Sequence, residues 1–224
     1  MSIAYNTSIA RNGLLLHLDA ANPKSYPGTG TVLTDLSGNG KNGALLNGMT
    51  VSDGKFVNPD NRTKAIRIQA QDWSAFSNFT VDIWYKRTGV NNHGTGGPGL
   101  PSYYQGIFNY YWDGSNNIFV GTTSNASSTD LKIFNTPATT LALNTWVHIT
   151  GITGPGGCSA YINGNLVGTG TGITINPNKD VYFGNWDTSW ASFCEIGVIK
   201  VYSRALVVEE IRQNFEANRG RYGI

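Results

Sequence analysis

Charged side chains are scarce in this chain of 224 residues. Asp, Glu, Lys and Arg together make up 13% of the sequence, and the formal net charge is only +2. The basic residues are scattered, which argues against the electrostatic footprint of a nucleic-acid-binding protein. No run approaches the roughly 18 apolar residues that a membrane-spanning helix needs. The sequence therefore predicts neither a nucleic-acid partner nor insertion into a membrane.

Cysteine and targeting signals are equally sparse. The two cysteines, Cys158 and Cys194, lie far apart and outside any Cys-x-x-Cys or Cys/His spacing. We therefore expect buried free thiols, and neither a zinc site nor a disulfide framework. Residues 1–6 lack a basic start and an apolar run, so the sequence predicts no secretory signal and synthesis in a cytoplasm.

Glycine and aromatic residues are abundant instead, with 28 Gly and 12% Phe, Trp and Tyr. Such a composition suits short strands joined by tight turns around an aromatic-rich core, and it predicts an all-β fold. Strands are expected at residues 14–19, 79–86, 146–152, 159–162, 166–167, 181–184 and 195–202. Asn163-Gly164 is expected to close a hairpin, because Asn-Gly favours the turn type that joins twisted strands.

One amphipathic helix is expected near the end of the chain, at residues 206–215. Val207, Ile211 and Phe215 fall on one stripe at a spacing of four residues, and Ser203 marks the expected cap. Residues 1–12 form an irregular arm ahead of a domain at 13–224. This arm and the loop 88–104 are nearly uncharged, so we expect them to make the contacts of a homo-oligomer or a larger shell.

Three parts of the chain carry a family resemblance. They are the opening GLLLHLDAANPKSYPGTGTVLTDLSGNGKNGALLNG, the middle segments FTVDIWYKRTG, WVHITGITG and AYINGNLVG, and the ending IGVIKVYSRALVVEEIRQNFEANRGRYGI. Together they resemble laminin-G-like, concanavalin A-like domains of tailed-phage and marine viral structural proteins. The resemblance implies a two-sheet antiparallel jelly-roll sandwich with one short C-terminal helix. Segment 58–75 departs from it, since AIRIQAQDW stands where many members have a Phe-Asp-Gly step.

The resemblance implies a non-enzymatic virion structural or adhesion protein, such as a capsid decoration, fibre or tail-associated domain on a virion surface. Its expected partners are other virion proteins or further copies of itself, with host-surface glycans as a candidate ligand. The alternative is a cellular carbohydrate-binding lectin. A glycoside hydrolase is the least favoured class, because the chain has only four Glu and no acid pair at the spacing of a retaining enzyme. Asp82 is expected to face solvent or to anchor a turn.

Three segments combine aromatic rings with short polar side chains. Sugars bind such surfaces by placing C–H faces on rings while their hydroxyls meet carboxylates and amides. The alternative is that these rings fill the core or a subunit interface. The candidate glycan-binding residues are Tyr103, Tyr104, Tyr111, Trp112, Asp113, Trp186, Asp187 and Trp190.

One segment resembles half of a calcium-binding loop. Asp35, Ser37 and Asn39 place oxygen side chains at positions 1, 3 and 5 with Gly40 at position 6, and Asp19 is a candidate fourth ligand. No acidic residue follows at position 12. The alternative is a turn in which Asp and Asn side chains bond to their own backbone. Calcium is the one cofactor that the sequence suggests.

Overall fold

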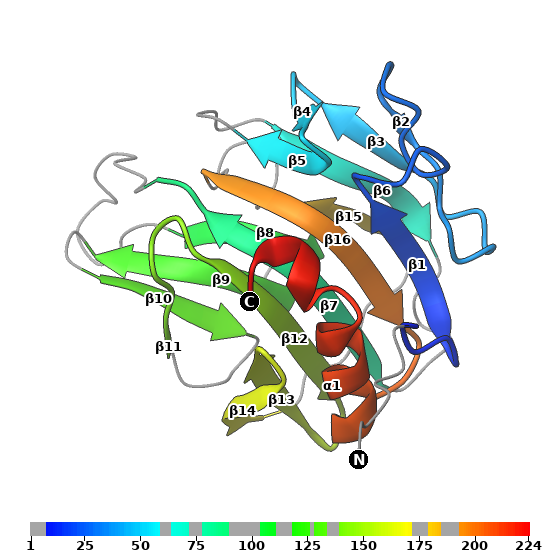
Figure 1. The fold of residues 1–224 in the computed structure, drawn as a ribbon. Helices are drawn as coiled ribbons and strands as arrows, with labels where there is room; N and C mark the ends of the chain where they lie inside the picture. Colours follow the sequence, from blue (N-terminus) through cyan, green and yellow to red (C-terminus); the bar gives the residue numbers. More distant parts are fainter. Residues whose placement is uncertain are drawn as a thin grey trace, which may run out of the picture.

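Two antiparallel β-sheets face each other in the computed structural model, and a C-terminal helix lies against the outer surface of one of them (Figure 1). The structure describes residues 8–58, 64–71, 78–89, 104–110, 118–125, 128–133, 139–171, 179–184 and 193–224. This arrangement confirms the predicted all-β, two-sheet jelly-roll sandwich with a short C-terminal helix.

Sheet A is built around three long strands, each of nine residues. Its order is β14 (Asn165–Gly170), β13 (Gly157–Ile162), β12 (Trp146–Gly154), β7 (Phe79–Arg87), β16 (Cys194–Tyr202), β5 (Lys55–Asn58) and β4 (Thr50–Ser52). Strand β1 (Leu14–Asp19) also pairs with β16. Strands β5 and β1 share one side of β16, since β5 pairs with its first residues and β1 with its last.

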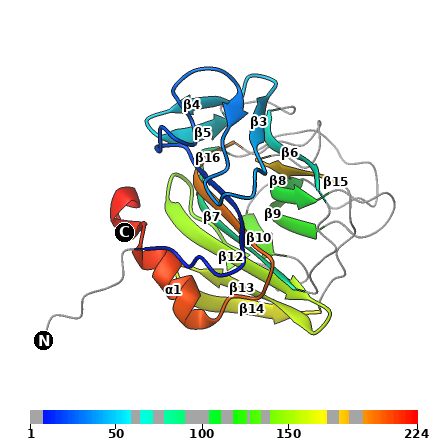
Figure 2. The same ribbon diagram turned by 90° about the vertical axis from the view of Figure 1, so that its right-hand side faces the viewer.

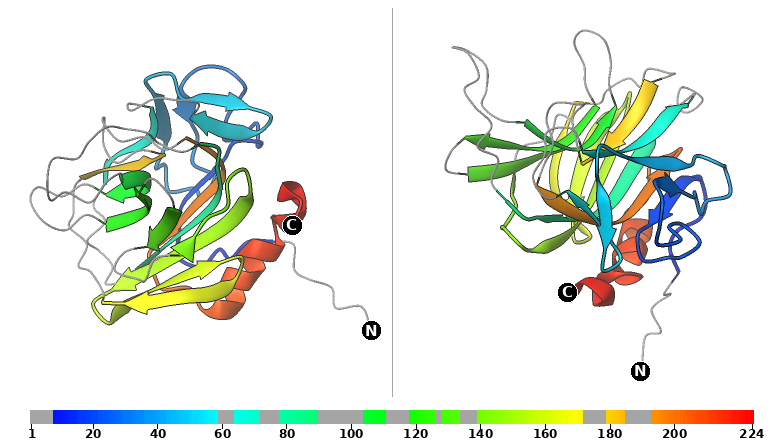
Figure 3. Two further views of the ribbon diagram at one scale, coloured as in Figure 1. Left: turned by 90° about the vertical axis from the view of Figure 1, so that its left-hand side faces the viewer. Right: turned by 90° about the horizontal axis from the view of Figure 1, so that it is seen from above.

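Sheet B packs behind sheet A (Figures 2 and 3). Its order is β11 (Thr139–Thr140), β10 (Ser128–Ile133), β9 (Ile118–Asn125), β8 (Tyr104–Tyr110), β15 (Lys179–Phe183), β6 (Ala65–Gln71), β3 (Gly43–Leu46) and β2 (Val32–Leu33). All pairings within it are antiparallel. The strands β1, β7, β12, β13, β14, β15 and β16 were expected from the sequence, whereas β8, β9 and β10 were not.

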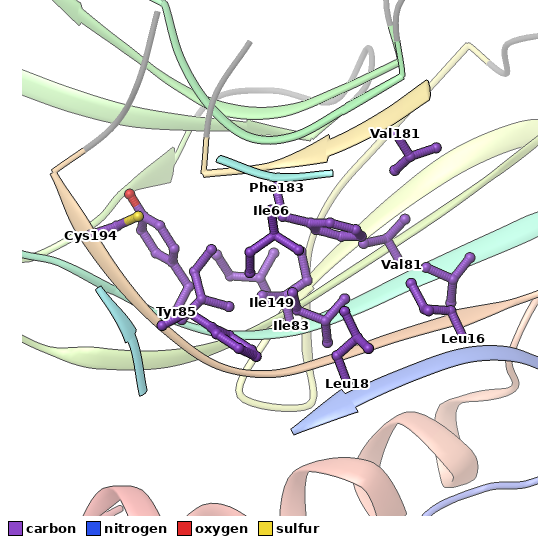
Figure 4. Packing of buried hydrophobic residues seen from close by; sticks show 14 of the residues in the cluster. Leu16, Leu18, Ile66, Val81, Ile83, Tyr85, Ile149, Val181, Phe183 and Cys194 are labelled. Carbon is purple, nitrogen blue, oxygen red and sulfur yellow. The ribbon is translucent and has the colours of Figure 1, made fainter. Parts of the chain in front are cut away.

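The main hydrophobic core lies between the two sheets. Figure 4 shows side chains from both sheets meeting there: Leu16, Leu18, Ile66, Val81, Ile83, Tyr85, Ile149, Val181, Phe183 and Cys194. These residues alternate along their strands, which is the pattern expected when one face of a pleated sheet is buried. Both Cys158 and Cys194 are buried and neither forms a disulfide, as expected.

Strand β7 is buried on both faces. Val81, Ile83 and Tyr85 belong to the core between the sheets, while Asp82 and Trp84 point to the outer face of sheet A and are also inaccessible. The C-terminal segment covers this outer face (Figure 2). The cover explains why Trp84 interrupts the alternation of apolar and polar residues in the sequence: its ring packs against that segment instead of facing water.

The covering segment consists of helix α1 (Val208–Glu216) and the 3₁₀ turn η1 (Arg219–Tyr222). Ile211 and Phe215 are buried against sheet A, as the helical periodicity predicted, whereas Val207 is exposed. The expected cap at Ser203 is wrong. The helix begins after Val207, whose backbone N–H donates to Glu210 Oε2 at 3.1 Å. A carboxylate in the first turn stabilises this end because the unpaired N–H groups there carry partial positive charge.

The predicted Asn163-Gly164 hairpin turn is confirmed. Both residues adopt left-handed φ angles, 50° and 77°, and the turn joins β13 to β14. Left-handed angles at both central positions match the twist of the flanking strands, and Asn and Gly adopt them at little cost. The turn packs beside α1, since an ideal Cβ on Gly164 would lie 3.3 Å from Cγ of Arg212.

Tyr222 anchors the end of the covering segment. Its ring stacks on Trp84, with centroids 4.3 Å apart and planes 17° from parallel, and it also contacts Trp146. Its hydroxyl occupies the space above Gly197 in β16, where any side chain would collide with it. The missing side chain at Gly197 therefore makes room for the terminal tyrosine. Among the described residues, no helix is long and apolar enough to cross a bilayer.

Replacing Gly197 with alanine is expected to lower the free energy of unfolding by about 1–3 kcal/mol, the usual cost of forcing an extra methyl group into a packed site. An ideal Cβ there would lie 1.8 Å from the Tyr222 hydroxyl oxygen. Urea denaturation followed by tryptophan fluorescence measures the change. Gly220→Ala is the matched control, because nothing lies within 4 Å of a Cβ at that position. Equal stability of the two variants would contradict this packing.

Candidate functional site

The candidate glycan-binding residues lie almost entirely outside the described part of the chain. Only Tyr104 lies within it, as the first residue of β8, and for this residue the structure describes the backbone alone. The described strands show where the segments that carry the other candidates join the fold. One segment connects β7 to β8, one connects β8 to β9, and one follows β15. Strands β9 and β15 are the two neighbours of β8 in sheet B.

Strand direction separates the points where these segments join. Tyr110, at the end of β8, pairs with Val181 near the start of β15, and Phe108 pairs with Phe183. The chain therefore leaves β15 toward the Tyr104 end of β8, while the connection to β9 starts at the opposite end. Seven residues of strand span about 20 Å. The predicted residues thus attach at two ends of one strand of sheet B.

The residues predicted to bind calcium lie beside β1. Asp35 Oδ1 accepts hydrogen bonds from the backbone N–H groups of His17 and Ser37, each at 2.9 Å. Its other oxygen, Oδ2, accepts from the Lys41 backbone N–H at 3.1 Å and lies 2.7 Å from the Ser37 hydroxyl. Both oxygens of this buried carboxylate are therefore engaged by donors of its own turn.

The same turn covers the outer edge of β1. The Leu36 N–H donates to the carbonyl of His17 at 2.8 Å, and the Asn39 side-chain amide donates to the carbonyl of Leu14 at 2.8 Å. Together with the bond from His17 N–H to Asp35, these contacts satisfy backbone groups that an edge strand would otherwise leave open. Asp35, Ser37 and Asn39 thus have a structural role: their turn covers the free edge of β1.

Asp19, the fourth predicted calcium ligand, has its own partners. Its Oδ1 lies 2.7 Å from Nη1 of Arg221 and accepts from the Ala21 backbone N–H at 3.0 Å. No cluster of three His, Cys, Asp or Glu side chains suited to a metal occurs among the described residues. Because N–H groups and a guanidinium occupy the positions that a cation would take, these residues do not fit a calcium ion as arranged. The geometry favours the turn interpretation.

A second polar cluster was not expected from the sequence. Asp82, His148 and Lys200 come from β7, β12 and β16, and all three side chains have no solvent-accessible surface. The strand register brings them together, since Asp82 pairs with Thr150 on one side and with Lys200 on the other. Asp82 Oδ1 lies 2.6 Å from Lys200 Nζ and 2.9 Å from His148 Nε2. The expectation that Asp82 faces solvent is therefore wrong.

Helix α1 completes this cluster from above. The Asn214 side-chain amide donates to Asp82 Oδ2 at 3.0 Å, and the Thr150 hydroxyl donates to the same oxygen at 3.2 Å. Asn214 also lies 3.0 Å from the Tyr202 hydroxyl, which donates to the carbonyl of Ala10. The Ala10 N–H in turn donates to Asn214 Oδ1 at 2.9 Å. One asparagine thus links the helix, sheet A and the segment before β1.

Charge explains why Asp82 stays ionised. Burial alone raises the pKa of its carboxyl, but the opposing effect of His148 and Lys200 is larger and holds the pKa well below its usual range. Burial, and then the negative charge of Asp82, raises the pKa of Tyr202, which keeps that hydroxyl protonated as a donor. The described geometry therefore contains a carboxylate matched to a cation in a site without water access.

Such a site cannot act on a substrate. The Asp82–His148 contact resembles the pairs that orient a catalytic base, but none of the atoms involved reaches the surface. The contacts instead join three strands to the helix. Lone histidines in strands were expected to be structural, and the position of His148 agrees with that interpretation.

Three further described carboxylates also face cations. Lys86 lies 2.7 Å from Glu195, Arg219 lies 2.8 Å from Glu216, and Arg204 forms a two-pronged contact with Glu210. Asp19 and Asp82 are paired as described above. A retaining glycosidase needs two carboxyl groups about 5–5.5 Å apart on either side of the sugar bond. Within the described residues, these five acids are held in ion pairs instead.

The sequence also matches a known protein family. A model of the concanavalin A-like lectin/glucanases superfamily matches residues 60–212, more than half of the chain. The chain belongs to this superfamily. A comparison with curated proteins finds no sequence relative. The family contains both enzymes and lectins, as its name states. Membership alone therefore does not distinguish an enzyme from a lectin, and the residues of the site have to do so.

Solved structures agree on the fold. The sialidase of Trypanosoma rangeli in complex with the inhibitor DANA matches 96% of this chain and 35% of its own, at a TM-score of 0.68 and 15% identity. The receptor-binding domain of botulinum neurotoxin type G matches 92% and 51%, at a TM-score of 0.63 and 16% identity. A structure of botulinum neurotoxin type C, whose cell entry depends on interaction with two ganglioside molecules, matches 92% of this chain and 51% of its own, at a TM-score of 0.63 and 17% identity. The chain thus spans about a third to a half of these proteins.

These findings correct the expected role in a virion. The similar structures named above belong to a sialidase and to botulinum neurotoxins, and together with the family model they support a lectin-like fold rather than a capsid, fibre or tail protein. The alternative of a carbohydrate-binding lectin domain is better supported.

Part of the arm predicted to contact other subunits instead contacts helix α1 of the same chain. The Ala10 N–H donates to Asn214 Oδ1, and the Gln213 side-chain amide donates to the Ser8 carbonyl.

Asp82→Asn is expected to lower the free energy of unfolding by about 3–5 kcal/mol, because it leaves the Lys200 cation buried without a counter-charge. Urea denaturation measures the loss. Glu195→Gln is the matched control on the same sheet: its partly exposed pair with Lys86 should contribute less than about 1 kcal/mol. Asp82→Leu combined with Lys200→Met should recover part of the loss, since an apolar pair of similar volume needs no counter-charge. Equal effects of the Asn and Gln variants would refute the buried pair.

Acid should unfold the protein partly through Asp82. Its folded pKa lies below the unfolded value of about 3.9. The stability it contributes is therefore present above that value and is lost as the pH falls further, because the unfolded chain then binds the proton more readily. We expect the Asp82→Leu/Lys200→Met variant to lose less stability than the parent protein between about pH 4 and pH 2. Parallel curves for the two proteins in chemical denaturation would contradict this assignment.

Proposed function

We propose that this chain is a non-catalytic carbohydrate-binding domain of the lectin type. Its superfamily includes lectins by name. Its fold is similar to that of a sialidase solved with sialic acid and of a neurotoxin whose cell entry depends on gangliosides, which are glycan-bearing molecules. At identities of 15–17% these likenesses concern the fold, so the proposal depends on where this chain carries sugar-binding chemistry.

The proposal rests mainly on chain connectivity. The outer face of sheet A is closed by α1 and η1, whose Phe215 and Tyr222 pack on Trp84. The eight candidate residues, by contrast, all belong to segments that begin or end at β8, β9 or β15, three adjacent strands of sheet B. All the candidate residues thus adjoin strands of sheet B, in one segment within that sheet and in two segments that run between it and β7 or β16 of sheet A. The outer face of sheet A, by contrast, packs against the chain's own C-terminal segment.

The chemistry of those segments suits neutral or weakly acidic sugars. Flat aromatic rings stack on the C–H faces of pyranoses, and neighbouring carboxylates and amides accept or donate bonds to hydroxyls. Low overall charge is compatible with such a ligand, because sugars are recognised through many short-range contacts rather than through long-range attraction. The non-catalytic part of the proposal is supported by the ion pairs that occupy Asp19, Asp82, Glu195, Glu210 and Glu216.

A glycan array followed by isothermal titration tests the proposal. We expect binding to at least one glycan class and a roughly tenfold weaker affinity for Trp112→Ala or Trp186→Ala, since one stacked ring contributes about 1–1.5 kcal/mol. Tyr161→Ala, on the α1 side of sheet A, is the control that should keep the affinity. Thermal melts verify that every variant is folded.

The same glycans serve as substrates in a reducing-sugar assay, where no turnover is expected. Two results would overturn the proposal: an array without any bound glycan, or hydrolysis that a single Asp or Glu replacement abolishes. The second result would establish the glycoside hydrolase instead.

A further inference from the structure

The sheet edges of this protein are protected unequally. The strands β2, β4 and β11 that end the sheets are only two or three residues long. The free side of β1 is capped by the turn around Asp35. Shortness and capping are two ordinary ways in which proteins keep an edge from pairing with another chain. Strand β14, at the remaining end of sheet A, has neither protection.

Strand β14 offers six residues, Asn165–Gly170, and pairs only with β13. Its sequence, NLVGTG, contains no charge and no proline. Leu166 and Val167 are exposed by 55% and 37%. Among the described residues, no side chain or turn bonds to the outer backbone groups of this strand. A long, neutral and partly apolar edge of this kind is the feature that natural sheets usually avoid unless it is used.

We propose that β14 pairs with β14 of a second copy of this chain, in antiparallel orientation, so that sheet A continues across a two-fold axis. In such a contact the strand pairs with its own copy, so a charge near the two-fold axis would lie close to its like-charged copy. The absence of charge along β14 removes that penalty. This inference stands independently of the proposed sugar binding.

The nearest described cation is compatible with self-pairing. Arg212 of α1 lies beside Gly164, at one end of β14. Antiparallel pairing places the two copies of Arg212 at opposite ends of the joined strands. The six residues of β14 span about 20 Å, which is longer than the screening distance of about 8 Å at physiological salt.

The register shift in β14 sets the details of the contact. A bulge lies between the residues paired with Ala160 and Tyr161, so Val167 is the extra residue on the edge strand. A bulge bends and twists a strand, which leaves Gly168–Gly170 as the regular stretch for backbone pairing. Leu166 and Val167 then supply apolar side chains beside it. Two copies joined in this way would carry two sets of sheet B segments, which raises the avidity of a weak ligand site.

Analytical ultracentrifugation over a concentration series tests the proposal. We expect the mass to rise from that of one chain, 24.2 kDa, toward twice that value. Leu166→Lys and Val167→Lys should each raise the dimer dissociation constant at least tenfold, because a charged lysine on an edge strand disfavours its pairing with another strand. Val32→Lys is the matched control, since Val32 is 59% exposed on the two-residue edge strand β2, and it should dimerise like the parent protein.

Hydrogen–deuterium exchange locates the contact directly. Backbone amides of Asn165–Gly170 should exchange more slowly at high than at low protein concentration, and this difference should vanish in Val167→Lys. A parent protein that stays monomeric across the series would overturn the proposal, as would a dimer that both lysine variants leave intact. The glycan array is run on the same variants, so loss of sugar binding and loss of dimerisation are read separately.

Discussion

The buried contact between Asp82 and Lys200 is the constraint around which this fold is arranged. It lies at the centre of sheet A, where the register of β7 with β12 and β16 is set. A carboxylate without access to water is tolerated only when cations and hydrogen-bond donors replace its hydration. Three of those groups, Lys200, His148 and Thr150, come from sheet A, and one, Asn214, comes from the helix. Placement of the C-terminal helix is therefore tied to the same carboxylate that ties the strands together. A shift of any one strand by a single residue would turn one of these groups to the opposite face of the sheet and leave Asp82 incompletely paired.

The closure of sheet A limits where function can reside. Trp84, Phe215 and Tyr222 form a stacked aromatic layer over the charged cluster, and the notch at Gly197 receives the last aromatic ring. Aromatic residues in this chain thus have two uses. Those of β7, α1 and η1 pack against one another, whereas the candidate ligand-binding rings belong to segments that adjoin β8, β9 and β15 of sheet B. The number of tryptophans and tyrosines in the sequence does not separate the two groups. Whether a ring on the outer face of a sheet is buried depends on which other segment covers that face, and the sequence does not show this.

Local patterns in the sequence were sufficient for much of sheet A and for the helix. The alternation in β7, the Asn163-Gly164 turn and the spacing of Ile211 and Phe215 each report on residues close in the chain. The Asp82 cluster could not be found in this way, since its members come from strands that lie far apart in the sequence and meet only through register. Strands β8, β9 and β10 were missed for another reason. Gly, Thr, Ser and Asn make up five of the eight residues of β9. Strand β8 contains Gly106 and Asn109 among its aromatic residues, and the short strand β10 contains Asp130 and Lys132. Strands of this composition look like loops until their hydrogen-bonded neighbours are known.

The turn at Asp35 shows how one set of residues supports two interpretations. Oxygen side chains at alternate positions followed by glycine are typical of cation loops, because a tight turn directs them to one point. The same geometry directs a carboxylate at its own backbone N–H groups, and here those groups include the N–H of His17 in the neighbouring strand. What decides between the two is whether an unprotected strand lies alongside. Strand β1 does, and its His17 N–H joins three donors of the turn itself at the Asp35 carboxylate. The sequence motif therefore encodes protection of a sheet edge, which is the property that β14, at the far end of the same sheet, lacks.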